Sequence, residues 1–157
     1  MEIERIFIEL CLYKSLDEVD ILINLCRIHK YIASNYKYDE EYNDLDSLLY
    51  KGIGNSYSCS LLFKELVDRL DIENYIGECN DNHYNNLVKI NNIYYIFDSG
   101  LELYYYHKKN EKILYAGMGI NSYNKLYSID NIPENILKDS LDISLINYYK
   151  SWLMSEN

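Results

Sequence analysis

Three side chains with complementary chemistry follow one another along the chain: a hydroxyl at Ser56, an imidazole at His83 and a carboxylate at Asp98. An imidazole can take the proton of a hydroxyl or thiol, and a carboxylate beside it fixes the tautomer that does so. Brought together, the three groups would form a nucleophile, a general base and an orienting acid. Taken separately, each has an ordinary structural use, since serine is a good helix N-cap and the other two lie in polar turn segments.

A β-hairpin is expected to bring the imidazole and the carboxylate together. Two stretches rich in Tyr, Ile and Val flank the asparagines at 91–92, and asparagine tolerates the positive φ that a two-residue turn requires. In the register that this turn sets, Ile90 pairs with Ile93. His83 is then the diagonal neighbour of Asp98 on the same face of the hairpin.

A helix that begins near Asn55 or Ser56 is expected to supply the third group. After Gly54, apolar residues recur at helical spacing, namely Cys59, Leu62, Phe63, Leu66 and Leu70. We expect this stripe to cover the hairpin face that carries Leu87 and Ile96. That packing would place the hydroxyl at the helix start beside the imidazole.

The remaining pattern predicts an α+β fold in a single domain, residues 1–157. Two N-terminal helices are indicated, the second opening with a capping box from Ser15 to Glu18. A polar surface loop is expected at 35–46. Further strands are expected at 74–79, 101–106 and 112–116, and a closing helix at 134–153.

Three short motifs accompany these residues, at 54–63, 70–73 and 83–86, and Asp98 follows the third. Together they resemble the transglutaminase-like branch of the papain-like cysteine protease superfamily. The core of that family reads Gly-x-Cys-x-x-Tyr-Ala-x-x-Phe, then Leu-Gly-Ile, then His-Ala-Trp-Asn, and it reaches an Asp about fifteen residues after the His. The resemblance covers residues 28–100.

The resemblance implies a papain/transglutaminase-like core, in which a central helix packs on an antiparallel β-sheet. It also implies acyl transfer at a peptide, amide or thioester, with Ser56, His83 and Asp98 as the catalytic residues. Water as acceptor gives a peptidase or amidase, and an amine gives amide-bond formation. Four residues are predicted to contact the substrate: Asn35, Tyr36, Tyr57 and Tyr84. The region of the first two, together with the N–H of residue 56, is expected to hold the oxyanion.

Serine at the position of the family's cysteine leaves four interpretations open. Residue 56 is an introduced Cys-to-Ser exchange, or a natural serine nucleophile, or the chain is a catalytically inactive domain that binds without turnover. In the fourth, Cys59 is the nucleophile under a shifted register. A hydroxyl keeps its proton until a base removes it, so a serine nucleophile would depend wholly on His83.

Charge and composition exclude several classes of function. The 157 residues carry 15 Lys and Arg against 25 Asp and Glu, a net charge of -10, which argues against nucleic acid as a partner. No apolar run approaches the roughly 20 residues of a membrane span, and the acidic N-terminus is unlike a secretory signal, so we predict a cytoplasmic protein. The four scattered cysteines are expected to be reduced, and no pattern for a metal or cofactor is present.

Other chemistry-bearing residues have two interpretations each. The tyrosines at 94–95 and 104–106 either line an acceptor cleft or simply form strands. The acidic loop at 39–44 would attract a cationic substrate or is only solvated. His29 lies on a helical stripe and is expected in the core or on a helix face, and not as a ligand. His107 is expected at the exposed end of an edge strand, where it is either solvated or touches the substrate.

Overall fold

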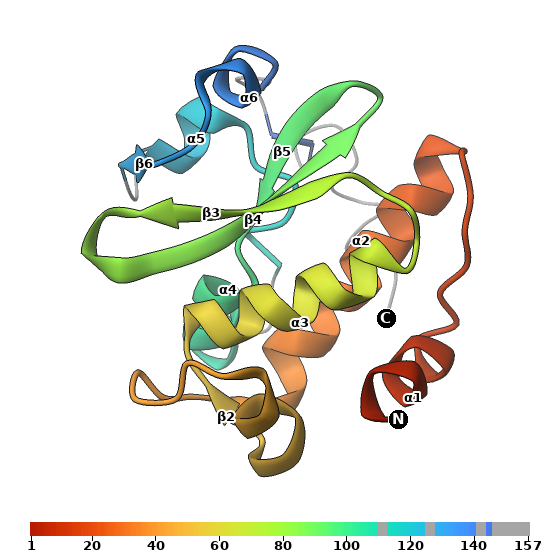
Figure 1. Cartoon of the computed structure of the whole chain (residues 1–157), viewed down its shortest axis with the longest axis vertical. Coiled ribbons are helices and arrows are strands. Elements are labelled where there is room, and N and C mark those ends of the chain that lie inside the picture. Colours follow the sequence, from red (N-terminus) through yellow and green to blue (C-terminus); the bar gives the residue numbers. More distant parts are fainter. Residues whose placement is uncertain (110–112, 125–127, 141–143, 146–157) are drawn as a thin grey trace.

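The computed structural model describes residues 1–109, 113–124, 128–140 and 144–145. A four-stranded antiparallel sheet runs through the molecule with helices on both faces, which is an α+β arrangement (Figure 1). The strand order is β5-β4-β3-β6. The strands are β3 (Asn74–Cys79), β4 (His83–Ile90), β5 (Ile93–Phe97) and β6 (Ile129–Asp130).

Two long helices pack on one face of the sheet, and short helices lie on the other (Figure 1). The long ones are α2 (Glu18–Asn35) and α3 (Ser56–Asp68), and the short ones are α5 (Ile120–Asn124) and α6 (Glu134–Lys138). The remaining elements are α1 (Glu2–Glu9), α4 (Ser99–Tyr105), β1 (Lys37–Tyr38), β2 (Ile53–Gly54) and the single turns Ser47–Lys51, Asn80–Asn82 and Tyr106–Lys109. β1 and β2 form a separate parallel pair. β1 lies within the predicted polar loop at 35–46, and β2 follows that loop.

The hairpin register predicted from the sequence is confirmed. Ile90 pairs with Ile93, and Leu87 pairs with Ile96. The turn residues 91 and 92 both have positive φ, at 51° and 66°. Asparagine adopts this conformation more readily than most residues, which is why the turn could be placed from sequence.

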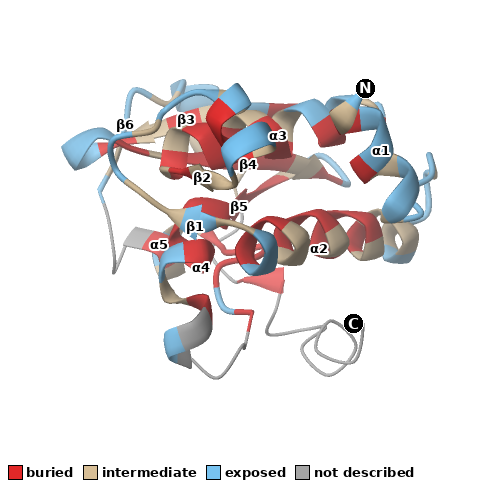
Figure 2. Cartoon of the chain, turned by 90° about the horizontal axis from the view of Figure 1, so that it is seen from below, coloured by how far each residue is buried: buried red, intermediate tan, exposed pale blue. Residues whose placement is uncertain are grey.

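The predicted packing of α3 is wrong in one respect, because the helix covers the opposite face of the hairpin. Cys59, Leu62, Phe63 and Leu66 share a buried cluster with Val88, Ile90, Tyr95 and Phe97. Leu87 and Ile96 instead pack with residues that follow the hairpin in the chain, including Leu101, Tyr115, Met118, Tyr123 and Ile136. The sheet therefore has a buried cluster on each side, and Figure 2 shows the inward sides of α2 and α3 buried.

Two strand predictions after the hairpin are corrected. Residues 101–106 belong mainly to α4, because Asp98 caps a helix there instead of opening a simple turn. Residues 113–118 run beside β5 without forming a named strand, and Ile96 and Met118 exchange backbone hydrogen bonds of 2.9 and 2.8 Å. Residue 112 lies outside the described residues.

The predicted start of α2 and the predicted end of the closing helix are also corrected. The N-cap of α2 is Asp17, whose carboxylate accepts the N–H groups of Val19 and Asp20, while Ser15 accepts the N–H of Asp17. The closing helix begins as predicted, but α6 ends at Lys138. Residues 141–143 and 146–157 of the predicted helix and tail lie outside the described residues.

His29 is fully buried, as predicted for a core position. All four cysteines are free thiols, and only Cys11 is exposed. No helix within the described ranges is both long and apolar enough to cross a membrane.

Candidate active site

Ser56 is the first residue of α3, which confirms the predicted helix start. The N-cap is Asn55, whose side-chain oxygen accepts the N–H groups of Tyr57 at 3.0 Å and Ser58 at 3.2 Å. The Ser56 hydroxyl oxygen accepts the backbone N–H of Tyr84 at 3.1 Å. This bond fixes the hydroxyl next to the residue that follows His83.

Gly100 allows α4 to pack directly on the backbone of Ser56. A Cβ atom at position 100 would lie 2.7 Å from the Cα atom of Ser56 and 2.9 Å from its Cβ atom. Contacts this short do not occur between real side chains, so only glycine permits the observed approach. The first turn of α4 therefore sets the position of residue 56 from the side of Asp98.

His83 and Asp98 form a hydrogen bond of 2.6 Å between Nε2 and Oδ2. Asp98 is fully buried, and its other oxygen caps α4 by accepting the N–H of Leu101 at 2.9 Å. His83 is 8% exposed and reaches the surface of a pocket. A carboxylate held by a helix cap on one side and an imidazole on the other has little freedom to rotate.

Tyr123 is a third partner of Asp98 and was missed by sequence reasoning. Its hydroxyl donates to Oδ2 of Asp98 at 2.5 Å and lies 3.7 Å from the Cys79 sulfur. Burial, and then the negative charge of Asp98, hold the pKa of Tyr123 well above its usual value, so the hydroxyl stays a donor. Tyr123 and Asp98 are 25 residues apart in the sequence, and no sequence pattern predicts that they are in contact.

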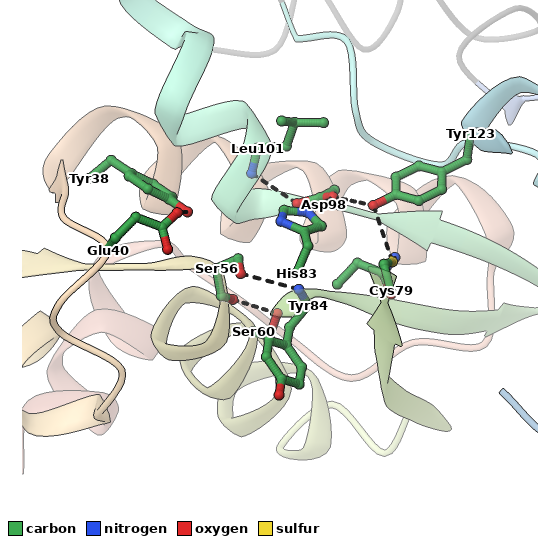
Figure 3. Close-up of polar contacts among 11 residues, drawn as sticks. Tyr38, Glu40, Ser56, Ser60, Cys79, His83, Tyr84, Asp98, Leu101 and Tyr123 are labelled. Carbon is green, nitrogen blue, oxygen red and sulfur yellow. Dashed lines mark hydrogen bonds and ion pairs between the residues drawn. The ribbon is translucent and has the colours of Figure 1, made fainter. Parts of the chain in front are cut away.

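The candidate nucleophile and the candidate base approach each other from opposite faces of the sheet. Ser56 belongs to α3, which packs on the sheet face that carries Val88. His83 and Asp98 lie on the other face, where Asp98 contacts Tyr123. They meet at the first residues of β4, as Figure 3 shows. The structure thus brings the three predicted residues together, although by a different packing from the one expected.

A pocket of about 470 Å³ opens over Ser56 and His83. It is lined by Tyr38, Glu40, Ser56, Asp81, Asn82, His83, Leu101, Tyr104 and Tyr105. Of the two tyrosine clusters considered from sequence, Tyr104 and Tyr105 contribute to this pocket, whereas Tyr94 and Tyr95 are buried in the clusters on the two faces of the sheet. The Tyr38 hydroxyl donates to the carboxylate of Glu40 on the pocket wall.

Asn35 and Tyr36, expected to contact the substrate and to supply an oxyanion donor, do not line this pocket. The Asn35 amide donates to the carbonyl of Tyr31 at 2.9 Å and lines a separate cleft between α1 and α2. The Tyr36 ring packs edge-on against Tyr31, with centroids 5.9 Å apart. From this part of the chain it is Tyr38 and Glu40, a few residues later, that reach the pocket.

Tyr57 and Tyr84, also predicted to contact the substrate, form a ring pair beside the pocket. Their centroids are 4.7 Å apart at an angle of 62°, and both rings are half-buried. Neither ring belongs to the pocket lining. Tyr84 instead contributes through its backbone N–H, which binds the Ser56 hydroxyl.

Cys59 lies in the core and not in the pocket. Its side chain is fully buried, and burial, with a smaller effect from the charge of Asp98, raises the pKa of the thiol well above its usual value. A thiol in this environment neither ionises readily nor meets a substrate.

The backbone of His107 belongs to the turn Tyr106–Lys109, not to a strand. Within the described ranges, no three His, Cys, Asp or Glu side chains are grouped so that they could hold a metal ion.

No family model and no curated protein matches the sequence. A crystal structure of a TGase is similar over 97% of this chain, with 12% sequence identity and a TM-score of 0.48. This chain spans 44% of the length of that structure.

Proposed function

We propose that the pocket over Ser56 and His83 catalyses acyl transfer or cleavage at an amide or thioester, within a transglutaminase-like fold. The observation that carries the proposal is the 2.6 Å bond from His83 to the buried Asp98, formed where the first residue of α3 meets the pocket. Nε2 of His83 is engaged by Asp98, so Nδ1 is the ring nitrogen that exchanges a proton with Ser56. This division of the two nitrogens suits an oriented general base.

The proposed reaction has two steps, acylation of Ser56 and deacylation of the acyl-serine ester. The Ser56 oxygen bonds to the carbonyl carbon of the substrate while His83 takes the hydroxyl proton. The carbon–nitrogen or carbon–sulfur bond then breaks, and the leaving amine or thiol takes that proton. Water or an amine next attacks the acyl-serine ester, giving its proton through His83 back to the serine oxygen.

The oxyanion that forms in each step is stabilised by the start of α3. The first N–H groups of a helix have no acceptor within the helix, and Asn55 satisfies those of residues 57 and 58. The N–H of Ser56 is therefore the donor that we assign to the oxyanion. The positive end of the helix dipole adds to this stabilisation.

The chemistry of the pocket wall favours an amine as acyl acceptor. Two carboxylates, Glu40 and Asp81, line the pocket, and its described lining contains no lysine or arginine. The wall also presents the ring of Tyr38, whereas Tyr104 and Tyr105 already face the ammonium group of Lys108, at 4.6 and 6.0 Å from their centroids. A protonated amine is attracted to both kinds of group before it loses its proton and attacks.

A second candidate function is a catalytically inactive transglutaminase-like domain that binds without turnover. It is favoured by the environment of Ser56, which is only 3% exposed and already accepts the N–H of Tyr84. A hydroxyl held in this way also serves as an ordinary packing contact of a helix start. The two candidates make opposite predictions for covalent chemistry at this position.

Labelling with an electrophile separates the two candidates. We expect Ser56→Cys to react with a thiol-directed electrophile at residue 56, because a cysteine there would be ionised by His83 and by the helix start. Adding His83→Ala should slow that labelling by at least about tenfold. If Ser56→Cys reacts no faster than its His83→Ala counterpart, the pocket holds no working base and the binding domain is favoured.

A further inference from the structure

Behind the candidate site lies a second pair of a histidine and a carboxylate, which the proposed reaction does not use. Nε2 of His29 lies 2.7 Å from Oε1 of Glu102, and both side chains are fully buried. His29 comes from α2 and Glu102 from α4, so the contact ties together two helices that are 73 residues apart in sequence.

Glu102 also binds the backbone of the segment that runs beside β5. Its carboxylate accepts the N–H of Leu114 at 3.0 Å and that of Tyr115 at 2.8 Å. Together with His29, these donors surround a carboxyl group that is fully buried. A buried carboxylate is costly unless it is hydrogen-bonded in this way, and an apolar replacement often stabilises a core equally well.

The Tyr115 peptide links Glu102 to Asp98. While the N–H of Tyr115 donates to Glu102, its carbonyl accepts the N–H of Asp98 at 2.9 Å. Asp98 and Glu102 stand one helical turn apart, and the N–H of Glu102 donates to the carbonyl of Asp98 at 3.0 Å. The backbone of Asp98 is therefore held through the same residue that Glu102 anchors.

We propose that His29 and Glu102 are positioning residues that hold Asp98 in its hydrogen bond with His83. The pair fixes the segment around Tyr115, that segment fixes the backbone of Asp98, and the carboxylate of Asp98 then keeps the orientation of the His83 ring. Within the part of the chain that the structure describes, Nδ1 of His29 has no hydrogen-bond partner, so the ring makes its polar contact through Nε2 with Glu102. The consequence for catalysis rests on the proposed function, whereas the consequence for the geometry of His83 does not.

The geometry can be measured by NMR on the whole protein labelled with nitrogen-15. The chain has only three histidines, so the ring N–H signal of His83 can be assigned by its absence from His83→Gln. In Glu102→Gln we expect the hydrogen on Nε2 of His83 to exchange with solvent about tenfold faster, because its acceptor is less well held. In the same variant kcat for a small thioester should fall about tenfold, with KM within about twofold.

Two further comparisons exclude a merely structural effect. Asn24 is a matched control in α2, since it is also buried and donates to the Tyr13 carbonyl at 2.7 Å. Asn24→Ala should lower the melting temperature but leave the exchange of the His83 hydrogen and kcat unchanged. If Glu102→Gln does not fold, His29→Ala should accelerate exchange and His29→Gln, which keeps a donor for Glu102, should restore it.

Folded variants of Glu102 or His29 with unchanged exchange at His83 would overturn the proposal. So would Asn24→Ala if it accelerated exchange as much as they do. Failure of the proposed function is a separate result. It appears as absence of turnover in the unaltered protein, and the exchange rates measured on the same samples still decide whether the pair positions Asp98.

Discussion

Nε2 of His83 lies 2.6 Å from Oδ2 of Asp98 at the open end of the β4–β5 hairpin, and the Ser56 hydroxyl oxygen lies 3.1 Å from the backbone nitrogen of the next residue, Tyr84. These contacts join the start of β4, the start of α4 and the start of α3. The carboxylate is fully buried, so the imidazole is the member of this pair that can meet a substrate.

Asp98→Asn should reduce the rate of acyl transfer by about 10²- to 10⁴-fold while leaving the fold intact. The amide keeps the shape of the side chain but offers one acceptor oxygen where the carboxylate receives donors from His83, Tyr123 and Leu101. Steady-state kinetics with a small thioester would measure the loss, and circular dichroism would check the fold. Activity within twofold of the unaltered protein would show that the carboxylate does not orient the base.

Gly100→Ala should displace Ser56, because the added Cβ would lie 2.7 Å from its Cα atom. Overpacking of this kind costs about 1–3 kcal/mol of folding free energy. When Gly100→Ala is combined with Ser56→Cys, labelling of residue 56 by the thiol-directed electrophile should also be lost. Urea denaturation measures the first effect, and mass spectrometry of the labelled peptide measures the second.

Gly52→Ala is the control for this substitution. Gly52 has a φ of +73°, and no atom of the described residues lies within 4 Å of an added Cβ, so alanine is strained there without touching Ser56. It should destabilise the protein by about 1–2 kcal/mol and leave labelling unchanged. Equal loss of labelling in both variants would mean that the contact of Gly100 with Ser56 has no special role.

Tyr123→Phe should lower both stability and activity, because it removes the hydroxyl that donates to Asp98. We expect a loss of about 1–2 kcal/mol of folding free energy and roughly a tenfold fall in kcat. Tyr75→Phe is a suitable comparison, since its hydroxyl donates to Glu73 at 3.1 Å on an exposed part of the sheet. If Tyr123→Phe lowers kcat no more than Tyr75→Phe does, the Tyr123 hydroxyl does not contribute to activity.

Alkylation of the folded protein at pH 8 should modify Cys11 and spare the three other cysteines. Cys11 is exposed, whereas Cys26, Cys59 and Cys79 are buried. Burial raises the pKa of Cys79 to about 11, and it raises that of Cys59 still further, so both remain thiols at pH 8. Peptide mapping after a short exposure to iodoacetamide tests this, and rapid modification of Cys59 would revive it as a nucleophile.

The hairpin was predictable because its information is local. Two adjacent asparagines fixed the turn, and the turn fixed which residues of β4 and β5 face each other. The start of α3 was equally local, since Asn55 caps the helix through its own side chain. The turn was enough to place His83 beside Asp98, whereas the prediction that Ser56 lies near them relied on a packing of α3 that was wrong.

The packing of the hairpin was not predictable in the same way. Val88 and Leu87 are both apolar, so the strand itself does not say which face α3 covers. The tyrosines of 101–106 suggested a strand, yet the cap formed by Asp98 starts α4 there. Contacts such as that of Tyr123 with Asp98 depend on the folded arrangement of distant segments and leave no signal in one sequence.

Trapping an acyl group on the protein would test whether Ser56 is the nucleophile of the proposed reaction. The unaltered chain and Ser56→Cys would each be mixed with a small thioester, quenched in acid within seconds, and digested for mass spectrometry. We expect an acyl group on residue 56 that is absent in Ser56→Ala and reduced at least about tenfold in His83→Ala. No acyl group on residue 56 in either chain, or one that forms equally fast without His83, would contradict it.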